Sequence, residues 1–125
     1  MGNLHGEDDL KEFIIIMHES AAAWSKLPKD EQSRLMSLYG DWIANLKDSG
    51  SFVSGRPCGG QYRLLAGNGA GDVTDISIET DGLSDVVTGF FVIRARDMDH
   101  AVEIAKTCPA LRHGETIVVR EATHA

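Results

Sequence analysis

The stretch Phe13-Ile14-Ile15-Ile16-Met17 decides how this chain folds. It is short, rich in β-branched residues and apolar at every position, which is typical of a strand covered on both faces. A strand with one face in water would alternate apolar and polar residues. A second stretch of the same kind, Gly89-Phe90-Phe91-Val92-Ile93, lies far along the chain. Together they predict a sheet with at least two strands covered from both sides.

Two amphipathic helices accompany these strands. Pro28 suits the first turn of a helix, and Gly50 suits its end as a C-cap. Between them apolar residues recur every three or four positions and form one stripe: Leu35, Leu38, Tyr39, Trp42, Ile43 and Leu46. Asp97 is the expected N-cap of a second helix, which Pro109 stops.

Shorter strand-like segments fill the remaining chain. Residues 51–54 predict a short strand, and the Gly- and Pro-rich residues 55–60 predict a loop. Residues 61–66 and 73–80 predict the two strands of a Gly-linked hairpin. Residues 117–119 supply the last strand. This order predicts an α+β fold, a ferredoxin-like (split β-α-β) domain with an added β-hairpin.

The length of 125 residues corresponds to one domain. Because the first residues are polar and acidic, we expect a flexible N-terminal tail over residues 1–10 and a single domain over residues 11–125. Two helices cannot cover both faces of the predicted sheet. We therefore expect its second face to pack against another copy of the chain in a homodimer.

The charge pattern narrows the possible partners. Twelve Lys and Arg against nineteen Asp and Glu give a formal net charge of -7, and the basic residues are scattered, so we expect no nucleic-acid binding. The longest apolar run, residues 13–17, is far shorter than the about 20 residues of a membrane-spanning helix, so we expect no membrane association. No secretory signal is evident in the first ten residues, and we expect a cytoplasmic location in which Cys58 and Cys108 stay thiols.

Five segments occur together along the chain: Ala21-Ala22-Ala23-Trp24, Gly89-Phe90-Phe91-Val92-Ile93, Asp97-Met98-Asp99-His100-Ala101, Ala105-Lys106-Thr107-Cys108-Pro109 and Ile117-Val118-Val119-Arg120. In order and spacing they resemble the YCII-related family, specifically its branch named for an Asp-Gly-Pro-Phe motif (DGPF domain). The resemblance implies a ferredoxin-like fold that dimerises into an α+β barrel. It also implies relatives that act on chlorinated lactone intermediates or accompany sigma factors, most of them without an assigned activity.

The chain departs from the family pattern at functional positions. The motif's place is taken by Thr80-Asp81-Gly82-Leu83-Ser84, which keeps the Asp-Gly pair and replaces Pro and Phe. Tyr39 falls where many family members carry a His in the first helix, and Cys108 precedes Pro109 where the founding branch has an Asp. The His-Asp dyad of that branch is therefore absent from these positions.

His18 and Tyr39 are the candidate catalytic residues. His18 follows the first strand and precedes Glu19, which places an imidazole and a carboxylate at the mouth of the expected sheet. Tyr39 would donate a hydrogen bond to a ligand. The structural alternatives are a polar strand end for His18 and core packing for Tyr39.

Four residues are candidates for ligand binding: Trp24, Trp42, Arg56 and Asp81. The two Trp side chains would line a pocket for a flat or cyclic ligand, or pack in the core. Arg56 would hold a carboxylate group of a small anionic ligand, or be solvated at the surface. Asp81 would orient a His or accept a proton, or simply form a turn with Gly82.

We expect no cofactor and no metal site. His100 and Glu103 lie near Asp97 and Asp99, but such a charge set is typical of a solvated first helical turn. Cys108 is expected to be a packed core thiol. Two functions stay open: a small-ligand-binding or regulatory domain without turnover, or a lyase, isomerase or dehalogenase acting on an acidic cyclic metabolite.

Overall fold

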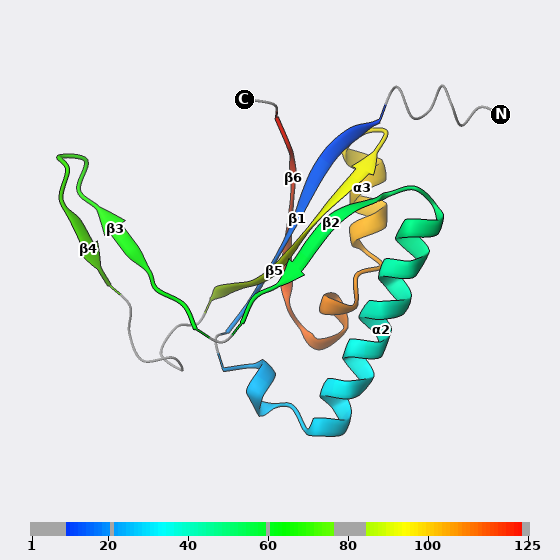
Figure 1. Ribbon diagram of the computed structural model, residues 1–125, viewed down its shortest axis with the longest axis horizontal. Helices are drawn as coiled ribbons and strands as arrows, with labels where there is room; N and C mark the ends of the chain where they lie inside the picture. The colour runs from blue at the N-terminus through cyan, green and yellow to red at the C-terminus, as the bar shows by residue number, and fades with distance from the viewer. Residues whose placement is uncertain (1–9, 21, 60, 77–84, 124–125) are drawn as a thin grey trace.

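A four-stranded antiparallel sheet forms the centre of the protein, in a computed structural model that describes residues 10–20, 22–59, 61–76 and 85–123. Its strand order is β2-β5-β1-β6, with the respective bounds Phe52–Pro57, Val86–Ala95, Lys11–Glu19 and Thr116–Glu121. Both long helices lie on one side of this sheet (Figure 1): α2 (Lys29–Asp48) and α3 (Met98–Ala105). The arrangement confirms the predicted ferredoxin-like α+β fold.

Shorter elements complete the fold. Two are 3-10 helices, η1 (Trp24–Lys26) and η3 (Pro109–His113), and two are the paired strands β3 (Leu65–Gly67) and β4 (Val73–Asp75). The β3–β4 hairpin projects away from the main sheet (Figure 1), which confirms the added hairpin. The first strand begins later than predicted, because residues 61–64 are not in strand conformation, and residues 77–80 of the second predicted strand lie outside the described residues.

The loop predicted at residues 55–60 is wrong in its first half. β2 continues to residue 57, because Gly55 and Arg56 pair with Phe91 and Phe90 of β5. A Cβ atom on Gly55 would lie 2.3 Å from Cδ1 of Phe91. This glycine therefore permits close packing of the strand over an aromatic ring and does not mark a turn.

Alternate side chains of β1 serve two different faces of the sheet. Phe13, Ile15 and Met17 are buried in the core with α2 and α3. Ile14 and Ile16 point the other way and are half-buried. Coverage is thus observed on the helix side, while coverage of the second face by another copy of the chain stays a prediction.

Phe91 lies at the centre of an aromatic core that joins α2 to the sheet. The Trp42 ring meets it edge-on, 5.0 Å between centroids, and the Tyr39 ring stacks at 6.5 Å. Phe52 packs against it at 6.4 Å. Trp42 Nε1 also donates to Thr107 Oγ1 at 2.7 Å, which ties α2 to the residues that follow α3. Such buried aromatic contacts account for much of the packing between helix and sheet.

The helix ends match their sequence signals. Asp97 Oδ1 accepts a hydrogen bond from the His100 backbone at 2.9 Å, which confirms it as the N-cap of α3. α2 begins directly after Pro28, and Gly50 with φ of 79° follows its end. In the described part of the chain, neither helix has the length and apolar character of a membrane span.

Leu35 and Met36 are neighbours on α2 that test this packing. Leu35 is fully buried, whereas Met36 is 56% exposed. Leu35→Ala should lower the free energy of unfolding by about 2–5 kcal/mol, since it removes buried methyl groups and leaves a cavity. Met36→Ala should change it by no more than about 0.5 kcal/mol. Urea denaturation of both variants measures the difference, and equal losses would contradict this orientation of α2.

Candidate functional site

The pairing of β1 with β5 is irregular near the end of β1. Met17 lies opposite Gly89 and His18 lies opposite Val87, so Thr88 is an extra residue on β5. A β-bulge of this kind bends the strand and re-aims the side chains beside it. This bulge lies beside the polar residues that end β1.

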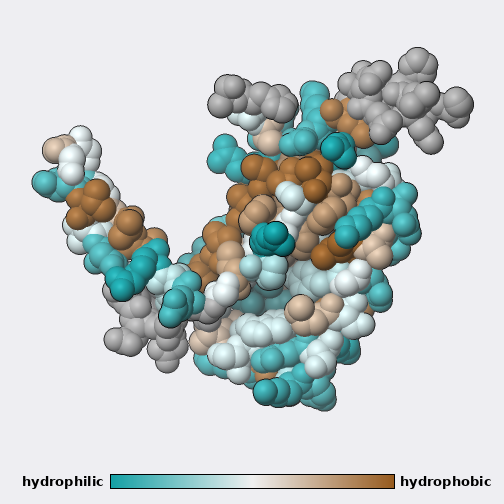
Figure 2. All heavy atoms as spheres, viewed as in Figure 1, coloured by the Kyte–Doolittle hydropathy of each residue, from teal (hydrophilic) through white to brown (hydrophobic). Residues whose placement is uncertain are grey.

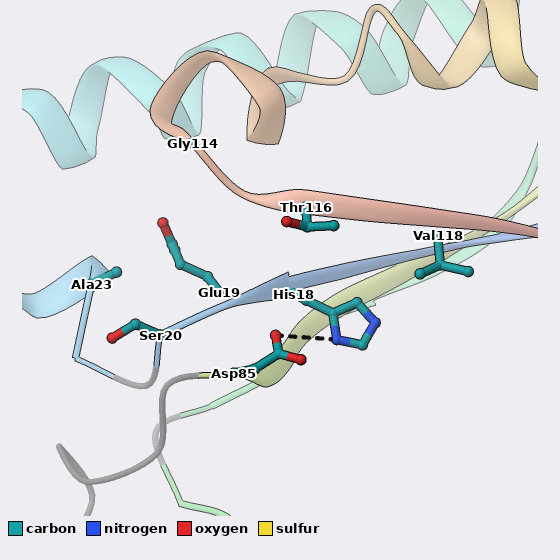
Figure 3. A pocket seen from close by; sticks show the side chains of 8 residues that line it. All are labelled: His18, Glu19, Ser20, Ala23, Asp85, Gly114, Thr116 and Val118. Carbon is teal, nitrogen blue, oxygen red and sulfur yellow. Dashed lines mark ion pairs between the residues drawn. The ribbon is translucent and has the colours of Figure 1, made fainter.

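A pocket lies at this end of β1 (Figure 3). It is lined by residues from β1, from the start of β6 and from the segments next to them: His18, Glu19, Ser20, Ala23, Asp85, Gly114, Thr116 and Val118. The lining combines groups that can hold or move a proton with the apolar side chains of Ala23 and Val118. Concave sites with a few convergent polar groups are where small molecules bind.

His18 and Asp85 form a pair at the rim of this pocket. His18 Nδ1 lies 3.5 Å from Asp85 Oδ1, with side-chain exposures of 25% and 67% (Figure 3). A carboxylate beside one ring nitrogen favours the tautomer with its proton on that nitrogen, which leaves Nε2 as a proton acceptor. The pair can therefore serve as an oriented general base.

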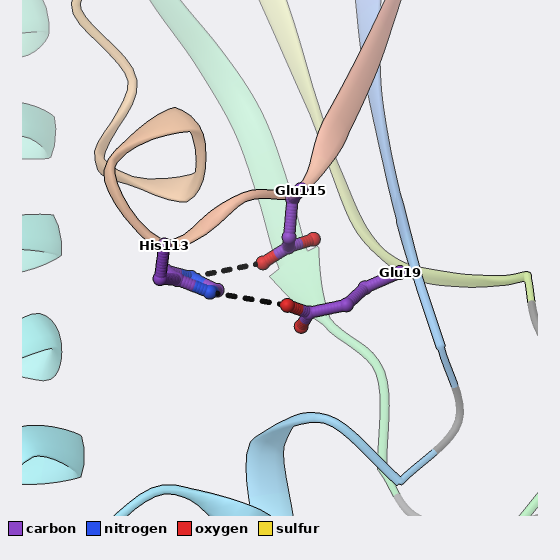
Figure 4. Close-up of side chains that lie close together, drawn as sticks. All are labelled: Glu19, His113 and Glu115. Atoms are coloured by element: carbon purple, nitrogen blue, oxygen red, sulfur yellow. Dashed lines mark hydrogen bonds and ion pairs between the residues drawn. The ribbon is translucent and has the colours of Figure 1, made fainter.

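Glu19 extends to the other side of β1 and joins a buried cluster with His113 and Glu115 (Figure 4). Glu19 Oε1 lies 3.2 Å from His113 Nδ1, and Glu115 Oε2 lies 3.1 Å from His113 Nε2. The side chains of Glu19, His113 and Glu115 are only 11%, 8% and 6% exposed. An imidazole thus lies between two carboxylates that have little access to water.

The surroundings of this cluster affect Glu115 most. Burial raises the pKa of the Glu115 carboxyl above its ordinary value, and a hydrogen bond from the Thr88 hydroxyl partly offsets this effect. Nearby Glu19 raises the Glu115 pKa further, while His113 and His18 lower it. Thr88 is the bulged residue of β5, so the irregular pairing supplies the Glu115 carboxylate with its hydroxyl donor.

The predicted site residues fall in different parts of the fold. Among the five that the structure describes, His18 alone lines the pocket. Trp24 lies beside the buried cluster, its ring edge-on to His113 at 6.4 Å between centroids. Trp42 is in the core, and Arg56 is exposed on β2. Asp81 lies outside the described residues.

Tyr39 lies on the helix-covered face, away from the pocket lining. Its hydroxyl is 3.7 Å from Met17 Sδ, and its ring stacks on Phe91. Burial raises the pKa of the Tyr39 phenol well above its ordinary value, and the nearby Cys108, Glu115 and Glu19 raise it further. Tyr39 is thus a weaker acid than an exposed tyrosine.

Three residues outside the predicted set complete the site: Asp85, His113 and Glu115. His113 and Glu115 flank Gly114, whose φ of 92° ends η3 before β6 begins. A Gly between polar residues is also an ordinary loop pattern. No spacing rule detects the cluster, because Glu19 and His113 are 94 positions apart.

The two cysteines should differ in reactivity. Burial raises the pKa of the Cys108 thiol to about 11, and its sulfur is packed against Met17, whereas Cys58 is exposed. A thiol reagent at pH 8 should label Cys58 within minutes and Cys108 only after unfolding, because the thiolate is the reactive form. Mass spectrometry of labelled peptides checks this expectation. Rapid labelling of Cys108 in the folded protein would contradict its confirmed position in the core.

Comparison with known proteins identifies the family. No curated protein matches the chain. The solved structure of 5-chloro-2-hydroxyhydroquinone dehydrochlorinase (TftG) from Burkholderia phenoliruptrix AC1100, in complex with 2,5-dihydroxybenzoquinone, is similar with a TM-score of 0.49 and 15% identity, over 91% of this chain and 95% of that chain. The profile of the YCII-related domain matches residues 12–121. The match covers the four strands of the main sheet, except for Lys11 at the start of β1, and both long helices, and the chain belongs to the YCII-related domain family.

Proposed function

We propose that the protein binds a small molecule in the pocket at the end of β1 and catalyses proton transfer on it, as a lyase, isomerase or dehalogenase does. The main observation in favour of this proposal is that His18 and Asp85 form a pair and both line this pocket. His18 Nε2 takes a proton from the substrate. Asp85 holds the ring through Nδ1 and stabilises the imidazolium that forms.

The charge of the lining favours a neutral, hydroxyl-bearing substrate over an anionic one. Asp85 brings a carboxylate, and His18 is the one lining side chain that can carry a positive charge. Arg56, the predicted carboxylate clamp, does not line the pocket. Substrate hydroxyls would donate to the Asp85 carboxylate, while a ring would rest on apolar surface such as Val118.

A ligand-binding or regulatory domain without turnover is the second candidate. Tyr39, the predicted hydrogen-bond donor, packs against Phe91 and Met17 on the helix-covered face, so it does not supply an acid opposite His18. A pocket with a base and without an opposing acid would bind a polar ligand and leave it unchanged. The two candidates share the pocket and differ in whether a substrate proton is removed.

The proposal also includes a homodimer formed through the open face of the sheet. Ile14, Ile16, Phe90 and Val92 are half-buried there, and Val118 is 38% exposed. An apolar sheet face of this kind is typical of an interface between copies. Because His18 and Val118 lie at one end of this face, a second copy would also narrow the opening of the pocket.

The β3–β4 hairpin also favours a homodimer. Figure 2 shows apolar residues gathered on the projecting arm, where Leu65 is 61% exposed and Val73 is 68% exposed. A two-stranded hairpin by itself is marginally stable in water. Contact with a second copy would cover these side chains and stabilise the arm.

His18→Gln tests the proposed catalysis. A thermal-shift screen of cyclic hydroxy-ketones comes first, since a ligand at a hundred times its Kd should stabilise the fold by about 2.7 kcal/mol. Wild-type protein should then speed exchange of an acidic C–H of that ligand with D2O, followed by NMR. His18→Gln should slow the exchange by about 100-fold or more, because it removes the base.

The matched control is His100→Gln, which changes a histidine on α3 outside the pocket lining. It should exchange at the wild-type rate. Equal exchange in His18→Gln would contradict the role of His18. Binding without any exchange would favour the domain without turnover.

Phe90→Lys tests the homodimer. A charged side chain in the middle of the open face should convert a sedimenting dimer to a monomer, because a buried ammonium without a partner is costly at an interface. Met36→Lys, on the exposed side of α2, should leave the dimer intact. Sedimentation velocity at micromolar concentration measures both, and a wild-type chain that sediments as a monomer would refute this part of the proposal.

A further inference from the structure

The proposed proton transfer leaves one feature unexplained, the buried cluster of Glu19, His113 and Glu115. We propose that these three side chains bind one divalent transition-metal cation beside the pocket. The site is distinct from the His18–Asp85 pair, because Glu19 and His18 extend to opposite sides of β1 (Figure 3). The inference therefore stands whether or not His18 acts as a base.

The two buried carboxylates of the cluster favour binding of a cation. Both carboxylates are at least 89% buried, with side-chain exposures of 11% for Glu19 and 6% for Glu115. Among the described residues, His113 is the one group that pairs with either of them by charge. With both carboxylates ionised, even a protonated His113 would leave one negative charge uncompensated in a desolvated place. Buried charges in proteins are normally paired or coordinate a metal.

The geometry at His113 Nε2 is that of neighbouring metal ligands. This nitrogen is buried and has no hydrogen bond, although Glu115 Oε2 lies only 3.1 Å away. Two atoms that ligate one cation lie this close together without a hydrogen bond between them, with the cation in front of both.

The spacing of the three donors also fits a single cation. One donor atom from each residue lies within 4.8 Å of the other two. Ligands bonded at about 2.1 Å can be at most about 4.2 Å apart, so the three donors are near the spacing of ligands on a single cation. Glu19 now lies beside Nδ1 and not beside Nε2, so its carboxylate would turn toward the cation on binding. Imidazole with two carboxylates suits Zn²⁺, Mn²⁺ or Fe²⁺, and the set has no thiolate that would favour softer ions.

The cluster has a route to the pocket. Glu19 and Gly114 both belong to the pocket lining, while Thr88 holds the far oxygen of Glu115. Three protein ligands would leave a coordination position on the pocket side for water or for a ligand hydroxyl. Thr88 would orient the Glu115 carboxylate from behind, as hydrogen-bonding groups around metal sites do.

The test is metal binding by the whole chain. EDTA-treated and dialysed protein is titrated with Zn²⁺ and separately with Mn²⁺ by calorimetry, and bound metal is counted by mass spectrometry of the elements. We expect one ion per chain and a higher melting temperature with the metal. Glu115→Gln and Glu19→Gln should each weaken binding at least tenfold, because each replaces a charged ligand by a neutral one.

One control variant separates this site from ordinary surface binding. His100→Gln removes a histidine outside both the cluster and the pocket lining and should bind the metal with wild-type affinity. Circular dichroism in EDTA verifies that each Gln variant is folded. No stoichiometric metal in the wild type, or equal affinity in folded Glu115→Gln, would overturn the inference. Exchange of the acidic C–H of the pocket ligand with D2O, measured with metal-free protein, tests the role of His18 separately.

Discussion

The extra residue Thr88 in the β1–β5 ladder is the constraint on which the site depends. Up to Met17, β1 and β5 pair in regular antiparallel register, and beyond it they are out of step. The bulge places the Thr88 hydroxyl within reach of Glu115 and 3.3 Å from the Met17 carbonyl oxygen. The same ladder that builds the core therefore ends in an irregularity that positions polar groups, as bulges near functional sites commonly do.

The strict alternation of β1 divides the molecule into two chemical environments. Its inward side chains pack beneath α2 and α3, and this is also where Trp42 is buried and Tyr39 packs against the core. Its outward side chains form the open apolar face, at whose end His18 meets Asp85. Tyr39 and Trp42, which the sequence grouped with His18 as candidate site residues, are thus separated from it by the thickness of the sheet. The pocket is built instead from groups that end or begin strands.

Burying two carboxylates around one imidazole works against stability. Desolvation of such groups costs several kcal/mol per ion unless partners compensate for it, and the raised pKa of Glu115 reflects this cost. The aromatic packing of Trp42 and Phe91 and the fully buried Leu35 provide the apolar stabilisation that lets the fold tolerate the cluster. Arrangements of strained or costly polar groups are more common at functional sites than elsewhere.

The sequence by itself determined the elements and their class. The apolar runs at 13–17 and 89–93, the stripe of α2 and the caps at Asp97 and Gly50 predicted the α+β fold, because these signals are local or periodic. The family came from the resemblance of several segments in order and spacing, and the profile match bears it out. The sequence also placed His18 at the end of a strand that borders the pocket. The length of β2 was not evident from the sequence, because Gly55 looked like a loop residue. Its place in the strand depends on the Phe91 ring on the paired strand, which leaves no room for a Cβ atom.

Only the tertiary structure decided which polar groups meet. Asp85 reaches His18 through the start of β5, and the buried cluster joins Glu19 to His113 and Glu115 from the far end of the chain. Tyr39 and Trp42 had the same helical spacing whether they faced a ligand or a core, and the packing against Phe91 settled this. The physical reason is that pairing across a sheet depends on register and on a single bulge, neither of which leaves a repeat in the sequence.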